Sequence, residues 1–104
     1  MVLWVMKYDI NPDKLDEYLK WAQGAIPRVI GAEGLVEFRG YRPVSGSHRV
    51  VTTCEFADLT AWQGWYESEP IQTTLAEMAS LTVNLETDLW GPSPVVPQPI
   101  RPGG

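Results

Sequence analysis

The sequence predicts an α+β domain in which two helices cover one face of a four-stranded antiparallel sheet. Residues 33–70 have the pattern of a β-hairpin that leads directly into an amphipathic helix rich in aromatic residues. A strand and a helix precede this stretch, and a further helical stripe and a strand follow it. The 104 residues suffice for one hydrophobic core and make a second domain improbable.

The first predicted strand covers Val2–Ile10, and the first helix starts at Asn11. An Asn side chain caps a helix by accepting a hydrogen bond from a free backbone amide, and Pro12 suits the first turn. Apolar residues then recur at helical spacing, at Leu15, Tyr18, Leu19, Ala22 and Ile26. We expect this helix to end near Gln23, because Gly24, Pro27, Gly31 and Gly34 favour an irregular turn. Trp21 lies off the stripe and is expected to be a surface or contact residue.

The hairpin consists of residues 35–41 and 49–56, which are rich in Val, Thr, Phe and Tyr and enclose a turn of Pro, Ser and Gly. Asp58 is the predicted cap of the second helix, which continues to about Tyr66. Pro70 then breaks or kinks the helical pattern, which resumes over residues 71–79. The last strand is predicted at residues 81–90. This order of elements is that of a ferredoxin-like βαββαβ fold.

Residues 1–91 are therefore predicted to form one domain, and residues 92–104 a proline-rich tail. Extended proline segments lose little entropy on binding, and Val95, Val96 and Ile100 alternate with the prolines. We expect the tail to be extended or docked on a partner subunit.

Alternation of side chains divides each predicted strand into two faces. The set expected to pack against the helices is Trp4, Met6, Tyr8, Val36, Phe38, Val50, Thr52, Cys54, Phe56, Val83, Leu85, Thr87 and Leu89. The opposite set mixes apolar residues with charges: Leu3, Val5, Leu35, Tyr41, Val51 and Trp90 with Lys7, Asp9, Glu37, Arg39, Arg49, Glu55, Glu86 and Asp88. This composition is typical of a polar-rimmed association surface, so we expect two sheets to face each other in a barrel-like homodimer.

Composition excludes several classes of function. The net charge of −5 and the scattered Lys and Arg residues argue against nucleic-acid binding. The apolar run at residues 2–6 is too short for a membrane anchor or signal peptide, so we expect a cytoplasmic protein.

The single cysteine, Cys54, lies inside a strand and is expected to be a buried thiol. One histidine and one cysteine provide no metal-binding motif, and we expect no metal or other cofactor.

The hairpin and second helix carry a family resemblance. Their spacing of Phe38, Tyr41-Arg42, Gly46, Arg49-Val50, Glu55-Phe56, Asp58, Ala61-Trp62, Trp65 and Ser68 resembles antibiotic biosynthesis monooxygenase-like domains of the dimeric α/β barrel superfamily. The likeness covers residues 2–90. It implies a range of activities: cofactor-independent oxygenation of polycyclic aromatic compounds, heme degradation, isomerisation of small lactones, or no assigned reaction.

Heme degradation is disfavoured by the same resemblance. That branch is characterised by an Asn on strand one, a Trp on helix two and a later His that ligates iron. The Trp is matched by Trp65, but the other positions fall near Met6 and Leu75, and the only histidine, His48, lies at the hairpin tip. Many family members carry a His where this chain has Trp65, and an indole cannot transfer protons near neutral pH as imidazole can.

The candidate substrate-binding residues are mainly aromatic: Trp4, Tyr8, Phe38, Thr52, Trp62, Trp65 and Tyr66. They either line a flat apolar cavity for a planar aromatic molecule or simply fill a small core, which is the commoner use of such residues. No residue stands out as a general base, so catalytic residues are not assigned. Two hypotheses follow: a cofactor-independent monooxygenase acting on a small aromatic or polyketide-like substrate, or a noncatalytic homodimeric small-molecule-binding or stress-associated protein.

Overall fold

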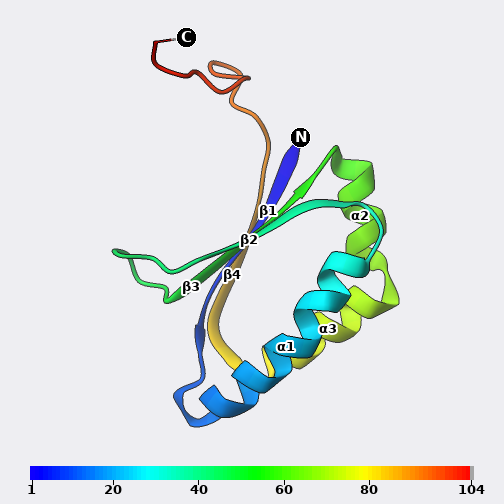
Figure 1. The fold of residues 1–104 in the computed structure, drawn as a ribbon, viewed down its shortest axis with the longest axis vertical. Coiled ribbons are helices and arrows are strands. Elements are labelled where there is room, and N and C mark those ends of the chain that lie inside the picture. The colour runs from blue at the N-terminus through cyan, green and yellow to red at the C-terminus, as the bar shows by residue number, and fades with distance from the viewer. Residues whose placement is uncertain (104) are drawn as a thin grey trace.

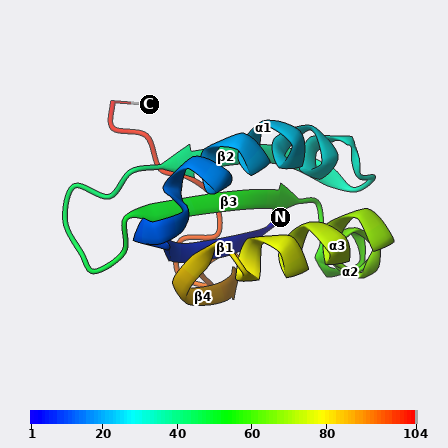
Figure 2. The same cartoon turned by 90° about the horizontal axis from the view of Figure 1, so that it is seen from below.

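A computed structural model describes residues 1–103 and shows the predicted α+β architecture. In chain order the elements are β1 (Val2–Ile10), a 3-10 turn η1 (Pro12–Lys14), α1 (Leu15–Gly31), β2 (Leu35–Tyr41), β3 (Val50–Phe56), α2 (Leu59–Glu67), α3 (Glu69–Ala79) and β4 (Thr82–Trp90). The four strands form one antiparallel sheet in the order β2-β3-β1-β4. All helices lie on one face of it (Figures 1 and 2), which confirms the ferredoxin-like fold.

The predicted start and break points of the helices are confirmed. The Oδ1 atom of Asn11 accepts a hydrogen bond from the amide of Asp13 at 3.0 Å, although the turn that it caps is η1 and α1 follows directly. Asp58 caps α2 by accepting from the amide of Ala61 at 2.8 Å. Pro70 lies in the first turn of α3, where its missing N–H costs no helical hydrogen bond.

Helix α1 continues to Gly31, so the predicted end near Gln23 was wrong. Pro27 removes one helical hydrogen bond. Packing outweighs this loss, because Ala25 is only 3% exposed and Val29 packs against the core. The break comes instead at Gly34, whose φ of +108° favours glycine and where a Cβ would lie 2.9 Å from the carbonyl oxygen of Ala61.

A β-bulge in β2 exchanges the predicted faces of Leu35 and Val36. The pairing with β3 shifts between Leu35 and Glu37, so that Leu35 lies opposite Phe56 and packs against the core. Val36, predicted to be internal, is 59% exposed. One extra residue in a strand turns the side chains before it to the other face, and simple alternation does not anticipate it.

The predicted core contribution of β4 was also wrong. A second bulge lies opposite Tyr8, where Asn84 has a φ of +58°, and it aligns Val83 with Asp9 of the open face. Leu85, Thr87 and Leu89 are exposed as well. β4 is the edge strand next to β1, and from Val83 onward none of its residues is buried.

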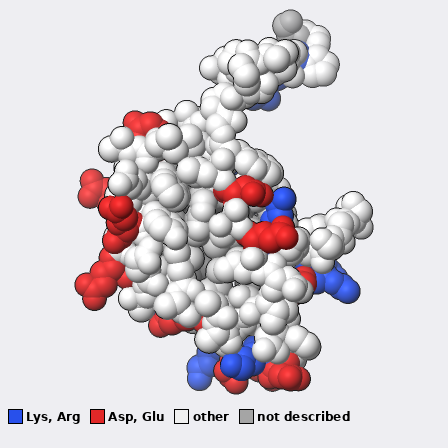
Figure 3. Space-filling view, turned by 180° about the vertical axis from the view of Figure 1, so that it is seen from behind, with Lys and Arg blue, Asp and Glu red and all other residues white. Residues whose placement is uncertain are grey.

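The core lies between β1, β3 and the helices. Its buried members are Trp4, Met6, Tyr8, Cys54, Phe56, Trp65, Ile71 and Met78. Acidic side chains mark the outer edge formed by α2 and α3 (Figure 3). No helix in residues 1–103 has the length and apolar composition needed to cross a membrane.

Beyond β4, the tail projects away from the sheet (Figure 1). The hydroxyl of Ser93 accepts hydrogen bonds from the amides of Val95 and Val96, which makes a local turn. Val95 and Ile100 are 86% and 78% exposed, so the tail presents apolar side chains to solvent. Gly104, the last residue of the predicted tail segment, lies outside the described residues.

Candidate functional site

A cavity of about 310 Å³ lies between the helix-covered face of the sheet and the three helices. The sheet contributes Trp4, Met6, Tyr8, Phe38, Gly40, Tyr41, Val50, Thr52 and Cys54 to its wall. The helices contribute Tyr18, Trp21, Ala22, Ala25, Ile26, Val29, Trp65, Ile71, Thr74, Leu75 and Met78. Most of the aromatic cluster therefore borders a partly open space, and it does not simply fill a core.

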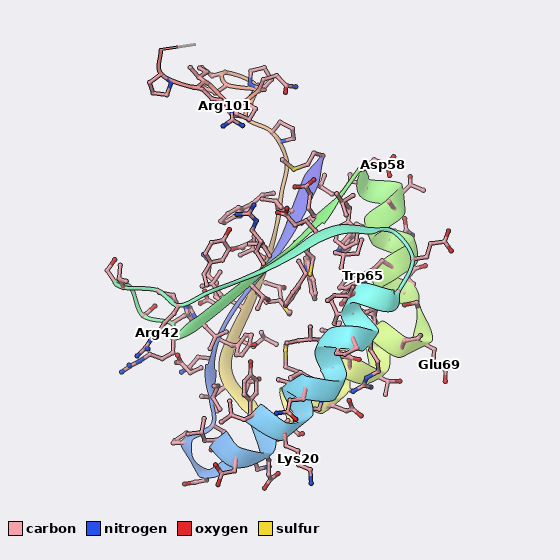
Figure 4. The ribbon with its side chains drawn as sticks, viewed as in Figure 1. Lys20, Arg42, Asp58, Trp65, Glu69 and Arg101 are labelled. Atoms are coloured by element: carbon pink, nitrogen blue, oxygen red, sulfur yellow. The ribbon has the colours of Figure 1, made fainter. Side chains whose placement is uncertain are left out.

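The wall of this cavity contains no Asp, Glu, Lys, Arg or His. Figure 4 shows the labelled Lys20 and Glu69 pointing away from the space between helices and sheet, whereas Trp65 lies on its inner side. Transfer of an unpaired charge into such an environment is costly. The cavity therefore favours an uncharged ligand.

The hydroxyl groups of Tyr8 and Thr52 are among the polar groups that the sheet contributes to the cavity wall. The hydroxyl oxygens of Tyr8 and Tyr18 are 2.6 Å apart and share one hydrogen bond between β1 and α1. Thr52 is only 8% exposed, and its Oγ1 atom has no hydrogen-bond partner in the protein. A buried hydroxyl without a partner is unfavourable, so Thr52 presents an unused donor and acceptor to whatever occupies the cavity.

Burial keeps two groups of the cavity wall protonated at neutral pH, the Tyr8 hydroxyl and the Cys54 thiol. Burial, with the Tyr18 hydrogen bond as a second cause, raises the pKa of the Tyr8 hydroxyl above its usual range. Burial also raises the pKa of the Cys54 thiol to about 12. The predicted buried thiol is confirmed, and neither group is ionised at neutral pH, so neither provides a general base or an activated nucleophile.

Aromatic rings form the end of the cavity near α2. The Trp65 ring lies edge-on to Trp4 at 5.6 Å and tilted against Phe56 at 5.0 Å between ring centroids. Trp65 is 2% exposed, and its Nε1–H donates to the carbonyl of Val29 at 3.3 Å. Contacts with β1, β3 and α1 therefore hold this indole in a fixed orientation.

Of the seven candidate residues, five line the cavity: Trp4, Tyr8, Phe38, Thr52 and Trp65. The other two, Trp62 and Tyr66, lie outside its wall. Their rings stack on each other at 5.0 Å, and Tyr66 meets Trp4 edge-on at 5.5 Å. Successive helical residues are rotated by about 100°, so Trp65 points to a different side of α2 from its neighbour Tyr66.

Sequence reasoning placed the inner face of α1 only in part. Of the predicted stripe, Tyr18, Ala22 and Ile26 line the cavity, whereas Leu15 and Leu19 are 47% and 52% exposed. Trp21, expected to be a surface or contact residue, is a contact residue: it lines the cavity, and its Nε1–H donates to Oε1 of Glu77 at 3.0 Å. The sequence does contain a pattern that marks the inner face of α1. Five residues of this face recur at helical spacing: Tyr18, Trp21, Ala22, Ala25 and Val29.

His48 lies away from the cavity. Its Nε2 atom is 3.0 Å from the carbonyl oxygen of Asn84 and 3.8 Å from a carboxylate oxygen of Glu86, which ties the hairpin tip to β4. Leu75, near which the resemblance places the iron ligand of the heme-degrading branch, contributes a hydrocarbon side chain to the cavity. Within residues 1–103, no three His, Cys, Asp or Glu side chains form a metal-binding group. These residues do not fit an iron-bound heme.

Comparison with known proteins places this architecture in a family. The sequence model described as Antibiotic biosynthesis monooxygenase matches residues 1–77. The chain belongs to this family. The match covers β1 through most of α3, and so includes every element that contributes to the cavity wall. A search of curated protein sequences gave no significant match.

Solved structures share the fold at low sequence identity. A variant of SnoaB, a cofactor-independent oxygenase from Streptomyces nogalater, superposes with a TM-score of 0.73 at 13% identity, covering 93% of this chain and 97% of that one. A dabb family protein with a ferredoxin-like fold from Mesorhizobium loti gives 0.79 at 12% identity, covering 88% and 96%. Rv0793 from Mycobacterium tuberculosis gives 0.73 at 14% identity, covering 88% and 94%. These similarities show the fold alone.

Proposed function

We propose that this protein binds a small, neutral, planar aromatic or polyketide-like molecule in the cavity and oxygenates it without a cofactor. The observation that carries the proposal is the uncharged, aromatic-walled cavity of about 310 Å³ with the unpartnered hydroxyl of Thr52 in its wall. Cavities of this size and lining are typical of small-molecule sites. Membership of the monooxygenase family supports the choice of reaction.

The polar groups define how a ligand would be oriented. Tyr8 pairs with Val50 and Met6 pairs with Thr52, so Tyr8 and Thr52 are diagonal neighbours on the same face of the sheet. In the Tyr8–Tyr18 pair one hydroxyl donates to the other, which leaves one proton free for a ligand acceptor. A ketone or phenol oxygen placed against Thr52 and Tyr8 would satisfy both, with the rings against Trp4 and Trp65.

The proposed reaction draws its electrons from the substrate. Loss of a proton from an activated CH₂ group gives a stabilised carbanion, which reduces O₂ and forms a C–O bond. One oxygen atom stays in the product as a ketone, and the other leaves as water. The protein binds and orients the substrate and limits its contact with bulk solvent. The proton lost from carbon is regained when the oxygen adduct breaks down to ketone and water, so CH₂ and O₂ give C=O and H₂O overall.

We also propose that the protein is a homodimer through the open face of the sheet. A groove of about 440 Å³ runs over this face between apolar residues such as Leu3 and Val51 and the charged Glu37, Arg39 and Glu55. Its mixture of apolar floor and charged rim suits a second copy of the same surface. The proposal retains the expected cytoplasmic location, which fractionation of cells expressing a tagged chain would test.

One observation favours a second function, a noncatalytic small-molecule-binding or stress-associated homodimer. The cavity wall contains no carboxylate or imidazole, and burial keeps Tyr8 and Cys54 protonated. A substrate that does not ionise readily would therefore bind without reacting.

Oxygen uptake with anthrone, combined with quenching of tryptophan fluorescence, separates the two functions. Uptake with formation of anthraquinone supports the oxygenase, and quenching without uptake supports the binding protein. The absence of both, with anthrone and with a panel of naphthols and quinols, would contradict the proposed cavity function.

Thr52→Val is the sharpest variant for this test, because it removes the hydroxyl and keeps the shape. We expect anthrone affinity to fall about fivefold to tenfold, as a hydrogen bond is lost, while unfolding in urea is unchanged or slightly more difficult because an unpaired buried group has been removed. Gly40→Val is the companion variant. A Cβ at Gly40 meets no atom within 4 Å, so the side chain should obstruct the cavity without straining the fold.

A further inference from the structure

A single carboxylate joins α1 to α3 beside the cavity. The Oε1 atom of Glu77 accepts a hydrogen bond from the Trp21 indole at 3.0 Å and from Nη2 of Arg28 at 2.6 Å. Trp21 and Arg28 are seven positions apart on α1, which is about two helical turns. Glu77 therefore holds one face of α1 at two points, although it is not part of the cavity wall.

The contacts continue from Trp21 to the polar groups of the cavity. The Trp21 ring packs against Tyr18 at 5.6 Å between centroids, and the Tyr18 hydroxyl is 2.6 Å from that of Tyr8. Trp21, Tyr18 and Tyr8 all line the cavity. An unbroken series of contacts thus runs from the ion pair on the helices to the buried strand β1.

We propose that Glu77 is a positioning residue of the cavity: by fixing the Trp21 indole and the spacing of α1 from α3, it sets ligand affinity without touching the ligand. This inference rests on the proposed function of the cavity as a ligand site. If the carboxylate is removed, the Trp21 indole loses its hydrogen bond and is less constrained, and so is the Tyr18 ring that it contacts, whose hydroxyl pairs with Tyr8.

If Glu77 only stabilised the fold, its removal would lower the free energy of unfolding and would leave ligand affinity unchanged. The Arg28 and Glu77 side chains are 36% and 43% exposed, and ion pairs at this exposure contribute little to stability. The hydrogen bonds from Arg28 and Trp21 hold the pKa of the Glu77 carboxyl below its usual range, so it is ionised and paired at neutral pH. Loss of Glu77 should therefore change the cavity more than the stability of the fold.

The test uses the full chain and three variants. Glu77→Ala removes both contacts of the carboxylate. Glu77→Gln retains an oxygen that can accept from Trp21 but removes the charge that pairs with Arg28. Glu69→Ala, at an exposed carboxylate in the first turn of the same helix, is the matched control.

Three measurements are made on each protein. The first is the position of the Trp21 indole N–H signal in ¹H–¹⁵N NMR spectra without ligand, which is assigned from its absence in a separate Trp21→Phe variant. The second is the dissociation constant for 1-naphthol, and the third is urea unfolding, which measures stability.

We expect Glu77→Ala to shift the Trp21 signal and to weaken 1-naphthol binding about fivefold, with stability close to that of Glu69→Ala. Glu77→Gln should restore part of the affinity. An unmoved Trp21 signal, or an affinity within twofold of Glu69→Ala, would overturn the inference. If the native protein fails to bind 1-naphthol and anthrone, the proposed function fails; a Trp21 signal displaced in Glu77→Ala alone would still support the positioning of this indole.

Discussion

On the helix-covered face of the sheet, Phe56 and Cys54 are 0% and 1% exposed, and the neighbouring cavity wall has no charged residue. On the open face, Val5 is equally buried at 1%, although no helix covers it. Lys7 and Trp90 lie diagonally across the Val5–Asp88 pair. The Lys7 ammonium is 5.7 Å from the Trp90 ring and 3.5 Å from Asp88. Long side chains of neighbouring strands thus enclose Val5.

The two faces therefore bury apolar groups by different means. The covered face uses aromatic rings from distant parts of the chain and leaves a partly open space between them. The open face uses neighbouring charged and aromatic side chains, and its charges remain accessible to a second surface. This difference supports the proposals of ligand binding on the covered face and of association through the open face, and each proposal can be tested by a variant that changes one face alone.

The largest effect is expected from Trp65→Ala on the covered face. Trp65 is 2% exposed and packs against Trp4 and Phe56, so its truncation should lower the free energy of unfolding by about 3–5 kcal/mol, measured in urea. Trp62→Ala is the matched variant. Its ring is only partly buried and stacks on Tyr66, so the loss should be clearly smaller. Equal losses of unfolding free energy in the two variants would contradict the assignment of Trp65 to the core and of Trp62 to its margin.

Val51→Asp should disrupt dimerisation through the open face without affecting the covered face. A carboxylate in the centre of a closed dimer interface would lose its hydration, and the pairing with Lys7 of the neighbouring strand would compensate only in part, so we expect the dimer dissociation constant to rise at least about 100-fold. Analytical ultracentrifugation measures this. Val44→Asp, in the fully exposed hairpin loop, is the control. A native protein that is monomeric at high concentration would exclude the proposed dimer.

Deletion of residues 92–104 should have a smaller effect on the same face. If the tail docks on the partner, its exposed Val95 and Ile100 become buried in the dimer, and the deletion should weaken dimerisation about tenfold or lower the melting temperature. A dimer of unchanged affinity and unchanged melting temperature would remove the idea of a docked tail.

Mild acid should give the smallest effect, acting on the polar contacts at the margins of both faces. Hydrogen bonds from Asn84 and from the Arg49 amide, with the nearby His48 and Arg49 charges, hold the pKa of the Asp9 carboxyl below its usual range, and Arg28 and Trp21 do the same for Glu77. A carboxyl whose pKa is lowered by folding stabilises the protein above the unfolded pKa, near 4.

This contribution is lost as the pH falls through the folded pKa. We therefore expect stability to decline below about pH 4, and Asp9→Asn combined with Glu77→Gln should flatten the decline. Urea unfolding at a series of pH values measures it. A decline of the same slope in the double variant would show that other carboxyls are responsible.

Much of the fold was predictable because its signals are local. The Asn11 and Asp58 caps and the break at Pro70 depend on hydrogen bonds and backbone angles within a few residues. The order of strands and helices followed from these signals. Of the candidate site, the five lining residues on β1, β2, β3 and α2 could be proposed from alternation and helical spacing.

The remaining features depend on contacts between distant parts of the chain. Bulges near Val36 and Asn84 reverse the alternation of single strands, and no local pattern marks them. The extension of α1 through Pro27 depends on packing against the sheet.

The sequence by itself determined which elements form and in what order, because caps, breaks and periodicity act over a few residues. Only the tertiary structure decided that the aromatic residues border a partly open space, that Trp21 lines it, and that Thr52 has no hydrogen-bond partner there. A cavity is a property of surfaces that meet across the fold, and its volume depends on how α1, α3 and the sheet are held apart. In this protein the spacing of the helices depends in part on Glu77, a residue that the sequence pattern did not single out.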